Sequence, residues 1–367
     1  MSFGGGSGSG SIAGSTDVVL SSPTNNQILG YNTSLAKWQN QTVSGFYVAY
    51  AAAPSGGNDT PILQAAMDAL AASNGGQLLL RPGSYSLRSQ LKIPNKVTIK
   101  GQGRSATTLA ADPTFFPINT PVVRLGDGIV GLAFASRVEN LTIECSNITG
   151  STGIYSNEIQ EMSGPSFCII AGFKLYGIHY EGNCADYEIN NCEVYPASTG
   201  ATYGIFLDNS LGSNLVRQST IGVNGHVNAG IMVQNGSATV MSIHVEDCTD
   251  GVLYAGSDGA VIGVTGPTAS TNITNLVRMD SSSRYVAVMG VTKNGATNAV
   301  RDDFFGKTIT DSMVQLCVLG DGHMARLNHY GDKAGFFGTT AIAKPTGVPV
   351  NAAGVHAALV SLGLIGA

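Results

Sequence analysis

Two carboxylic acids occupy matching positions in two neighbouring copies of a short sequence repeat, and a histidine lies two residues before one of them. The copies span residues 177–181 and 204–208, and they end on Glu181 and Asp208. If each copy is a β-strand and the strands stack ~4.8 Å apart, the two carboxylates stand side by side, with His179 next to them. Two carboxyl groups at short separation can act as the acid and the nucleophile of a retaining glycosidase, because proximity raises the pKa of one of them. The alternative interpretation is a pair of solvated carboxylates on a sheet face.

Aromatic and amide side chains share the expected outward face with these carboxylates. Tyr155 and Asn157 occupy the outward positions of the preceding copy. Phe206 occupies the outward position two residues before Asp208, equivalent to that of His179. We expect Tyr155, Asn157 and Phe206 to contact carbohydrate. In a catalytic site, His179 would orient a carboxylate and Phe206 would stack on a sugar ring.

The same outward row becomes apolar in the later copies. Phe206 is followed by Met232 and then by Leu253 in equivalent positions. An exposed apolar strip favours association, so we expect Met232 and Leu253 to lie in the interface of a homotrimer. Phe206 is open to either role.

A Gly followed by a short alternating strand is the repeat that positions these side chains. Copies recur every 21 to 27 residues and begin at Gly153, Gly177, Gly204, Gly230, Gly251, Asn275 and Asn298. A propeller blade needs about 40 residues, and leucine-rich repeats need a Leu/Asn consensus that is missing here. The spacing therefore predicts an all-β fold, a parallel β-helix (solenoid) whose stacked coils build the core. The leading Gly would suit a sharp corner with positive φ.

Composition narrows the class of protein. Charged residues make up 12% of the chain, against ~25% in an average protein, and 48 residues are Gly. A net charge of −5 without a Lys/Arg-rich run argues against nucleic-acid binding. No apolar run approaches the ~20 residues that cross a bilayer, so we expect no membrane insertion. The six Cys show no zinc-ligand spacing, so we expect free buried thiols, no metal and no cofactor. The histidines other than His179, among them His226 and His244, are expected in core or surface roles.

Four parts are predicted along the chain. They are a flexible Gly/Ser leader (1–17), a short β module resembling virion-attachment modules (18–45), the parallel β-helix with an N-terminal capping helix (46–300), and a small C-terminal module (301–367).

Signals for the capping helix follow residue 58. Asp59 or Thr60 is the expected N-cap, Pro61 takes the first helical position, and Gly75 and Gly76 end the helix. In the C-terminal module we expect a strand over 313–319 and a helix from 352 to about 364.

Three segments of the chain resemble the opening of pectate-lyase-superfamily β-helices. They are residues 57–70, 75–85 and 91–103. The resemblance implies a right-handed solenoid whose first coil is covered by the helix, in a superfamily of lyases, glycoside hydrolases and phage tail spikes. Residues 22–40 and 333–345 are similar to segments of phage tail-fibre and other phage structural proteins.

Together these features predict a bacteriophage virion protein, a tail spike or fibre that binds the surface polysaccharide of a bacterial host. We expect a homotrimer that contacts other virion proteins and is located in the virion after assembly in the host cytoplasm. Two alternatives stay open. One is a carbohydrate-degrading depolymerase, a glycoside hydrolase or lyase, and the other is a head-decorating fibre with a purely structural role. The chain lacks the Asn-x-Asp, Asp-Asp and Gly-His-Gly set of polygalacturonases, which counts against catalysis of that family's type.

Overall fold

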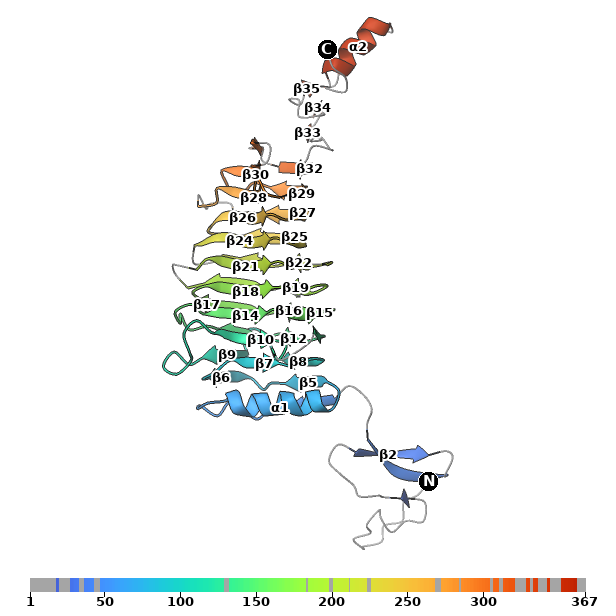
Figure 1. Cartoon of the computed structure of the whole chain (residues 1–367), viewed down its shortest axis with the longest axis vertical. Helices are drawn as coiled ribbons and strands as arrows, with labels where there is room; N and C mark the ends of the chain where they lie inside the picture. The colour runs from blue at the N-terminus through green and yellow to red at the C-terminus, as the bar shows by residue number, and fades with distance from the viewer. Residues whose placement is uncertain are drawn as a thin grey trace. The chain divides into compact units, whose positions relative to one another are not determined.

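A computed structural model describes the chain in two compact units, Met1–Tyr47 and Val48–Ala367 (Figure 1). The described residues are 18–19, 27–32, 36–42, 47–128, 132–182, 184–197, 201–210, 212–222, 226–267, 272–283, 285–303, 306–309, 313–320, 328–330, 333–335, 342–343 and 351–361.

The N-terminal unit is a small sheet. Its strands are β1 (Val18–Val19), β2 (Gln27–Asn32) and β3 (Lys37–Thr42), in the order β1-β3-β2. Strands β2 and β3 pair antiparallel, from Gln27 opposite Thr42 to Asn32 opposite Lys37. These strands lie within the short β module that the sequence predicts over residues 18–45.

The second unit is a right-handed parallel β-helix, as the sequence predicts. One face is a sheet that has ten strands in the described part of the chain. They are β7 (Leu91–Ile93), β10 (Pro121–Leu125), β14 (Thr152–Ser156), β18 (Tyr176–Glu181), β21 (Tyr203–Asp208), β24 (Val227–Gln234), β26 (Cys248–Ala255), β28 (Asn275–Met279), β30 (Asn298–Asp302) and β31 (Lys307–Ile309). We call it the long sheet.

Two further rows of strands complete each coil. The first row holds β4 (Tyr47–Tyr50), β5 (Gly76–Leu79), β8 (Val97–Lys100), β12 (Arg137–Glu139), β16 (Gly164–Ser166), β19 (Glu188–Asn190) and β22 (Leu215–Arg217). The second row holds β6 (Gly83–Leu87), β9 (Thr107–Ala111), β13 (Thr142–Glu144), β17 (Ile169–Phe173), β20 (Glu193–Pro196) and β23 (Thr220–Ile221). The rows merge in the long strands β25 (Ser237–Val245), β27 (Asp258–Thr265), β29 (Tyr285–Thr292) and β32 (Met313–Gly320). A two-stranded sheet pairs β11 (Ala133–Phe134) with β15 (Ile159–Gln160).

Strand register confirms the repeat. Ile154 pairs with Ile178, Ile178 with Ile205, and Ile205 with Ile231. All four side chains are buried, so each coil adds one layer to a continuous apolar core. Five cysteines in the described part of the core are free, as expected: Cys145, Cys168, Cys184, Cys192 and Cys248.

The repeated glycines serve a different purpose from the predicted one. Gly153, Gly177 and Gly204 are not among the residues with positive φ, so the expectation of a left-handed corner was wrong. A Cβ on Gly177 would overlap the Val194 side chain and would lie only 2.6 Å from the carbonyl oxygen of Gly204. These positions require Gly because the next coil and the facing row approach too closely for any side chain.

Helix α1 (Thr60–Ala72) lies against the first coil and buries Leu63, Met67 and Leu70, as predicted (Figure 1). Asp59 is the N-cap, but its carboxylate makes no capping hydrogen bond. It accepts hydrogen bonds from the backbone N–H groups of Ser55 and Ser86 instead, both at 2.9 Å.

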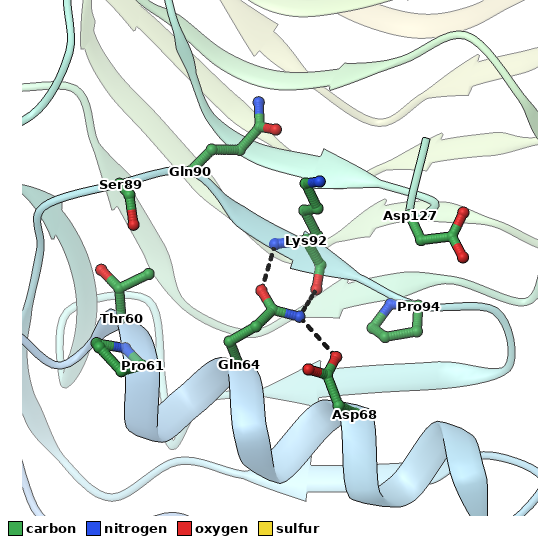
Figure 2. Close-up of a pocket in the computed structure, with 9 residues that line it drawn as sticks. All are labelled: Thr60, Pro61, Gln64, Asp68, Ser89, Gln90, Lys92, Pro94 and Asp127. Atoms are coloured by element: carbon green, nitrogen blue, oxygen red, sulfur yellow. Dashed lines mark hydrogen bonds between the residues drawn. The ribbon is translucent and has the colours of Figure 1, made fainter. Parts of the chain in front are cut away.

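Gln64 of α1 pairs with the edge of strand β7 as a peptide group would. Its Oε1 accepts a hydrogen bond from the N–H of Lys92 at 2.9 Å, and its Nε2 donates to the carbonyl oxygen of Lys92 at 3.0 Å (Figure 2). The helix therefore satisfies polar groups that an open sheet edge would otherwise leave available for aggregation.

Antiparallel pairing ends the coil repeat. Strand β32 pairs antiparallel with β29, and β31 pairs antiparallel with β30. The strand predicted over 313–319 is confirmed. Beyond it lie β33 (Asn328–Tyr330), β34 (Lys333–Gly335), β35 (Ile342–Ala343) and helix α2 (Ala352–Ser361). Neither described helix is long and apolar enough to span a bilayer.

Candidate functional site

The acidic pair predicted from the sequence lies on the outer surface of the long sheet. Strands β18 and β21 are neighbours, with His179 opposite Phe206 and Glu181 opposite Asp208. One ligand atom each of His179, Glu181 and Asp208 lies within 4.8 Å of the others. In the described part of the chain, this is the one place where three such donors converge. The three side chains could hold a cation as well as act on a substrate, since carboxylate oxygens and imidazole both bind metal ions.

Glu181 is held from two sides. The hydroxyl of Tyr155, on the preceding coil, donates a hydrogen bond to Glu181 Oε1. His179 Nε2 lies 3.6 Å from Glu181 Oε2. Burial and the hydrogen bond to the carboxylate both raise the pKa of Tyr155, so the phenol keeps its proton and remains a donor.

The imidazole of His179 is packed among aromatic rings. Its ring stacks on Phe206, with the centroids 4.8 Å apart and the planes at 8°, and Tyr176 approaches it at 4.7 Å. Burial lowers the pKa of His179, although the charges of Glu181 and Asp208 act in the opposite direction. Its Nε2 is buried and has no hydrogen-bond partner among the described residues. The histidine is therefore a neutral ring with a nitrogen directed at the acidic pair.

Asp208 is suited to hold a proton. Burial raises the pKa of its carboxyl group, the charge of Glu181 raises it further, and His179 opposes the shift. A raised pKa is what a general acid requires, because the group must be protonated at working pH. The neighbouring Glu181 accepts a hydrogen bond from Tyr155, which holds one of its carboxylate oxygens in place.

Two tyrosines that the sequence analysis missed form the aromatic surface of the site. Tyr176 and Tyr203 are partly exposed and stack on one another, with the centroids 6.0 Å apart and the planes at 9°. Each directly precedes a repeat glycine, so the shared Tyr-Gly-Ile sequence is a signal that could have identified them.

Phe206 lies beneath these tyrosines and is only 7% exposed. Its ring contacts Tyr176 at 5.2 Å and Tyr203 at 5.1 Å. The expectation that Phe206 stacks on a sugar therefore has to be corrected, because its neighbours already cover the ring.

Asn157 directly follows strand β14, and its side chain is exposed. Its Oδ1 accepts a hydrogen bond from Arg124 Nη2 at 2.6 Å. Arg124 also lies 5.2 Å from the centre of the Tyr155 ring and 3.5 Å from Glu158 Oε1. Arg124 belongs to strand β10, which lacks the Gly-Ile sequence, so the repeat gave no signal for it.

The predicted interface residues continue the same row. Met232 is 5% exposed and packs with Phe206 and Ala229, while Leu253 packs against this cluster and is partly buried. The apolar strip exists, but most of Met232 is covered within the chain itself. Its role between subunits stays a prediction.

A pocket of about 460 Å³ lies farther along the same face, between α1 and β7 (Figure 2). Its lining residues include Gln64, Asp68, Lys92 and Asp127. Lys92 is in register with Arg124, Tyr155 and His179 in turn. Three strand spacings, or ~14 Å, therefore separate the pocket from the acidic pair along one row.

Comparison with known proteins adds a family match. The family model described as "Rhamnogalacturonase A/epimerase, pectate lyase-like" matches residues 49–277. No curated protein sequence matches the chain.

Among solved structures, ORF18 of Geobacillus virus E2 is similar at 12% identity and a TM-score of 0.43, covering 84% of this chain and 72% of that one. The enzymatically active domain of tailspike protein 2 from bacteriophage CBA120 is similar at 15% identity and a TM-score of 0.46. The match covers 76% of this chain and 49% of the tailspike domain, so this chain spans about half of that protein. The A-module of mannuronan C-5 epimerase AlgE4 from Azotobacter vinelandii is similar at 13% identity and a TM-score of 0.33, covering 69% of this chain and 97% of the module.

Proposed function

The chain belongs to the rhamnogalacturonase A/epimerase, pectate lyase-like family, and from this premise we propose that it binds a polysaccharide along the long sheet and hydrolyses a glycosidic bond at Glu181 and Asp208. The observation that carries the proposal is the convergence of two carboxylates and a half-buried histidine within 4.8 Å, beside two partly exposed tyrosine rings.

Each carboxylate has a distinct role in this reaction. Asp208, whose pKa is raised by burial and by the charge of Glu181, donates a proton to the glycosidic oxygen as the bond to the anomeric carbon breaks. Glu181 attacks the anomeric carbon from the other side and forms a glycosyl-enzyme intermediate. Asp208, now ionised, then takes a proton from water, and the resulting hydroxide releases the sugar from Glu181. The separation within 4.8 Å supports this retaining route, because inverting enzymes need about 6.5–9.5 Å to place a water between the groups.

Neighbouring side chains hold the reacting groups in place. Tyr155 fixes one oxygen of Glu181 by its hydrogen bond, leaving the other for the substrate. His179 lies between Phe206 and the acidic pair as a neutral positioning residue. Tyr176 and Tyr203 offer the flat apolar surface on which a pyranose ring packs.

The row from the acidic pair to the pocket at Lys92 provides length for a polymer. Tyr155, Arg124 and Lys92 follow His179 at successive strand spacings. A substrate of several sugar units would therefore contact the protein well beyond the bond that is cleaved.

We place this activity in a bacteriophage virion, on a homotrimeric tail spike or fibre directed at a bacterial surface polysaccharide. The support is the similarity of residues 22–40 and 333–345 to phage structural segments, together with the low charge. Met232 and Leu253 are the proposed subunit contacts. Light scattering of the purified chain tests this part of the proposal, because a homotrimer has three times the mass of the 37.7 kDa chain and a monomer would refute it.

Turnover of capsular and lipopolysaccharide glycans by three variants tests the catalytic proposal. Glu181→Gln and Asp208→Asn should each lower kcat by about 10²-fold or more. Glu139→Gln, which changes a carboxylate on strand β12 instead, is the matched control and should leave kcat unchanged. Full turnover in either site variant would remove that residue from the mechanism. Binding of a glycan without any cleavage by the wild-type chain would favour a spike that only binds.

A further inference from the structure

A second arrangement of reactive side chains lies outside the acidic pair, where strands β24 and β26 begin. His226 Nδ1 lies 3.2 Å from Asp247 Oδ1, and His226 Nε2 lies 3.2 Å from the hydroxyl of Thr249. The amide Nδ2 of Asn272 donates a hydrogen bond to Asp247 Oδ1 at 2.7 Å, which fixes the carboxylate from the following coil.

The order of contacts matches an acid–histidine–alcohol triad. With its proton on Nδ1, His226 donates to Asp247, and the free Nε2 accepts the hydrogen bond of Thr249. A histidine held in this tautomer by a carboxylate is the base that activates a hydroxyl nucleophile, and the arrangement recurs on unrelated folds. We propose that Thr249, His226 and Asp247 form an esterase site that removes O-acyl groups from a polysaccharide.

The reaction needs only the ester and water. Thr249 Oγ1 attacks the acyl carbon while its proton passes to His226 Nε2. The ester C–O bond breaks, and the sugar hydroxyl leaves with that proton. Water, deprotonated by His226, then attacks the acyl-threonine and releases a carboxylic acid and free Thr249. Asp247 stabilises the imidazolium in both steps.

Exposure and position indicate a polymer-bound ester. The side chain of His226 is 45% exposed and that of Asp247 is 30% exposed, so a group projecting from a large chain can reach them. Thr249 lies on strand β26, in the same long sheet that carries Glu181 and Asp208. An acyl group on a glycan lying along the long sheet would thus be within reach. The chemistry of the triad does not depend on cleavage by Glu181 and Asp208.

The chain contains a natural control. His244 also bridges a carboxylate and a threonine, but through the opposite nitrogens. Its Nε2 lies 2.9 Å from Glu246 Oε1, and its Nδ1 lies 3.2 Å from Thr265 Oγ1. If both histidines only link neighbouring coils, replacing either one should have the same effect on esterase activity. The proposal assigns esterase activity to His226 alone.

Hydrolysis of 4-nitrophenyl acetate by the full chain tests the proposal. Thr249→Val keeps the shape of the side chain and removes the nucleophile, so it should lower the rate by about 10²-fold or more, as should His226→Ala. Thr249→Ser keeps a hydroxyl and should retain activity, and His244→Ala should match the wild type. Glu181→Gln should retain esterase activity, which separates this proposal from the glycosidase.

The acyl-enzyme gives a second readout. After brief reaction and acid quenching, peptide mass spectrometry should find the acetyl group on Thr249. A wild-type rate in Thr249→Val, or acetyl groups only on lysine or histidine, would overturn the proposal. If Thr249→Val fails to fold, Asp247→Asn takes its place and should show the same loss.

Discussion

Substitution of Gly177 by Ala tests whether close approach between coils accounts for the repeated glycines. A Cβ at this position would overlap Val194 Cγ1 and lie 2.6 Å from the carbonyl oxygen of Gly204 and 3.0 Å from Phe173 Cε1. The Gly204 oxygen belongs to the backbone of the next coil and cannot move without disturbing the stack. Overpacking of this kind costs typically about 1–3 kcal/mol, and a backbone neighbour favours the upper end.

The unfolded chain offsets part of this cost. Ala restricts the unfolded state and contributes about 0.4–1 kcal/mol in favour of folding. The net expectation for Gly177→Ala is therefore a loss of about 2 kcal/mol, a factor of roughly 30 in the folding equilibrium.

Guanidinium unfolding at fixed protein concentration measures the effect, with unfolding rates compared if refolding is incomplete. Gly57→Ala is the matched control, because the nearest atom to its new Cβ is Ser55 Oγ at 3.6 Å and its φ is not positive. It should be neutral or slightly stabilising. Equal stability of Gly177→Ala and the wild type would refute the account of the glycine ladder.

Three further outcomes follow from contacts already described. Asp208→Asn should stabilise the fold at neutral pH, because a carboxyl group whose pKa is raised by folding destabilises the folded protein when it is ionised. This gain in stability should vanish as the pH falls below the pKa of the unfolded state, and unfolding midpoints measured over a pH series check it. Tyr155→Phe should lower kcat by about 10–100-fold, because it removes a charge-assisted hydrogen bond worth about 1.5–3 kcal/mol. Glycan turnover measures this effect, and an unchanged kcat would contradict it. Gln64→Ala should speed hydrogen exchange at the N–H of Lys92 and cost about 1–2 kcal/mol, and exchange at the wild-type rate would count against edge capping by Gln64.

The sequence predicted the solenoid because its spacing and alternation report coil length and the inward face. It also placed Glu181 beside Asp208 correctly, since equivalent positions in parallel strands are in register. The rule that side chains alternate between the inner and the outer face failed at the first residues of these strands. In Tyr176–Glu181 the consecutive residues Gly177 and Ile178 are both buried, so Tyr176 lies on the outer face with His179. Strict alternation would have placed Tyr176 inside.

Other features depend on contacts between coils that the sequence does not encode locally. Arg124 contacts Asn157 from a coil without the repeat sequence. Asp247 and Thr249 contact His226 although they are 21 and 23 residues away in the sequence. The sequence predicted only a core or surface role for His226. These pairings form because residues about one coil apart in the sequence lie side by side on neighbouring strands.

The stereochemistry of the first product tests the central claim most directly. Proton NMR during early cleavage of a surface polysaccharide reports the anomeric configuration before mutarotation. Because Glu181 and Asp208 approach within 4.8 Å, the account predicts retention of configuration. Inversion, or an unsaturated sugar formed by elimination, would contradict it.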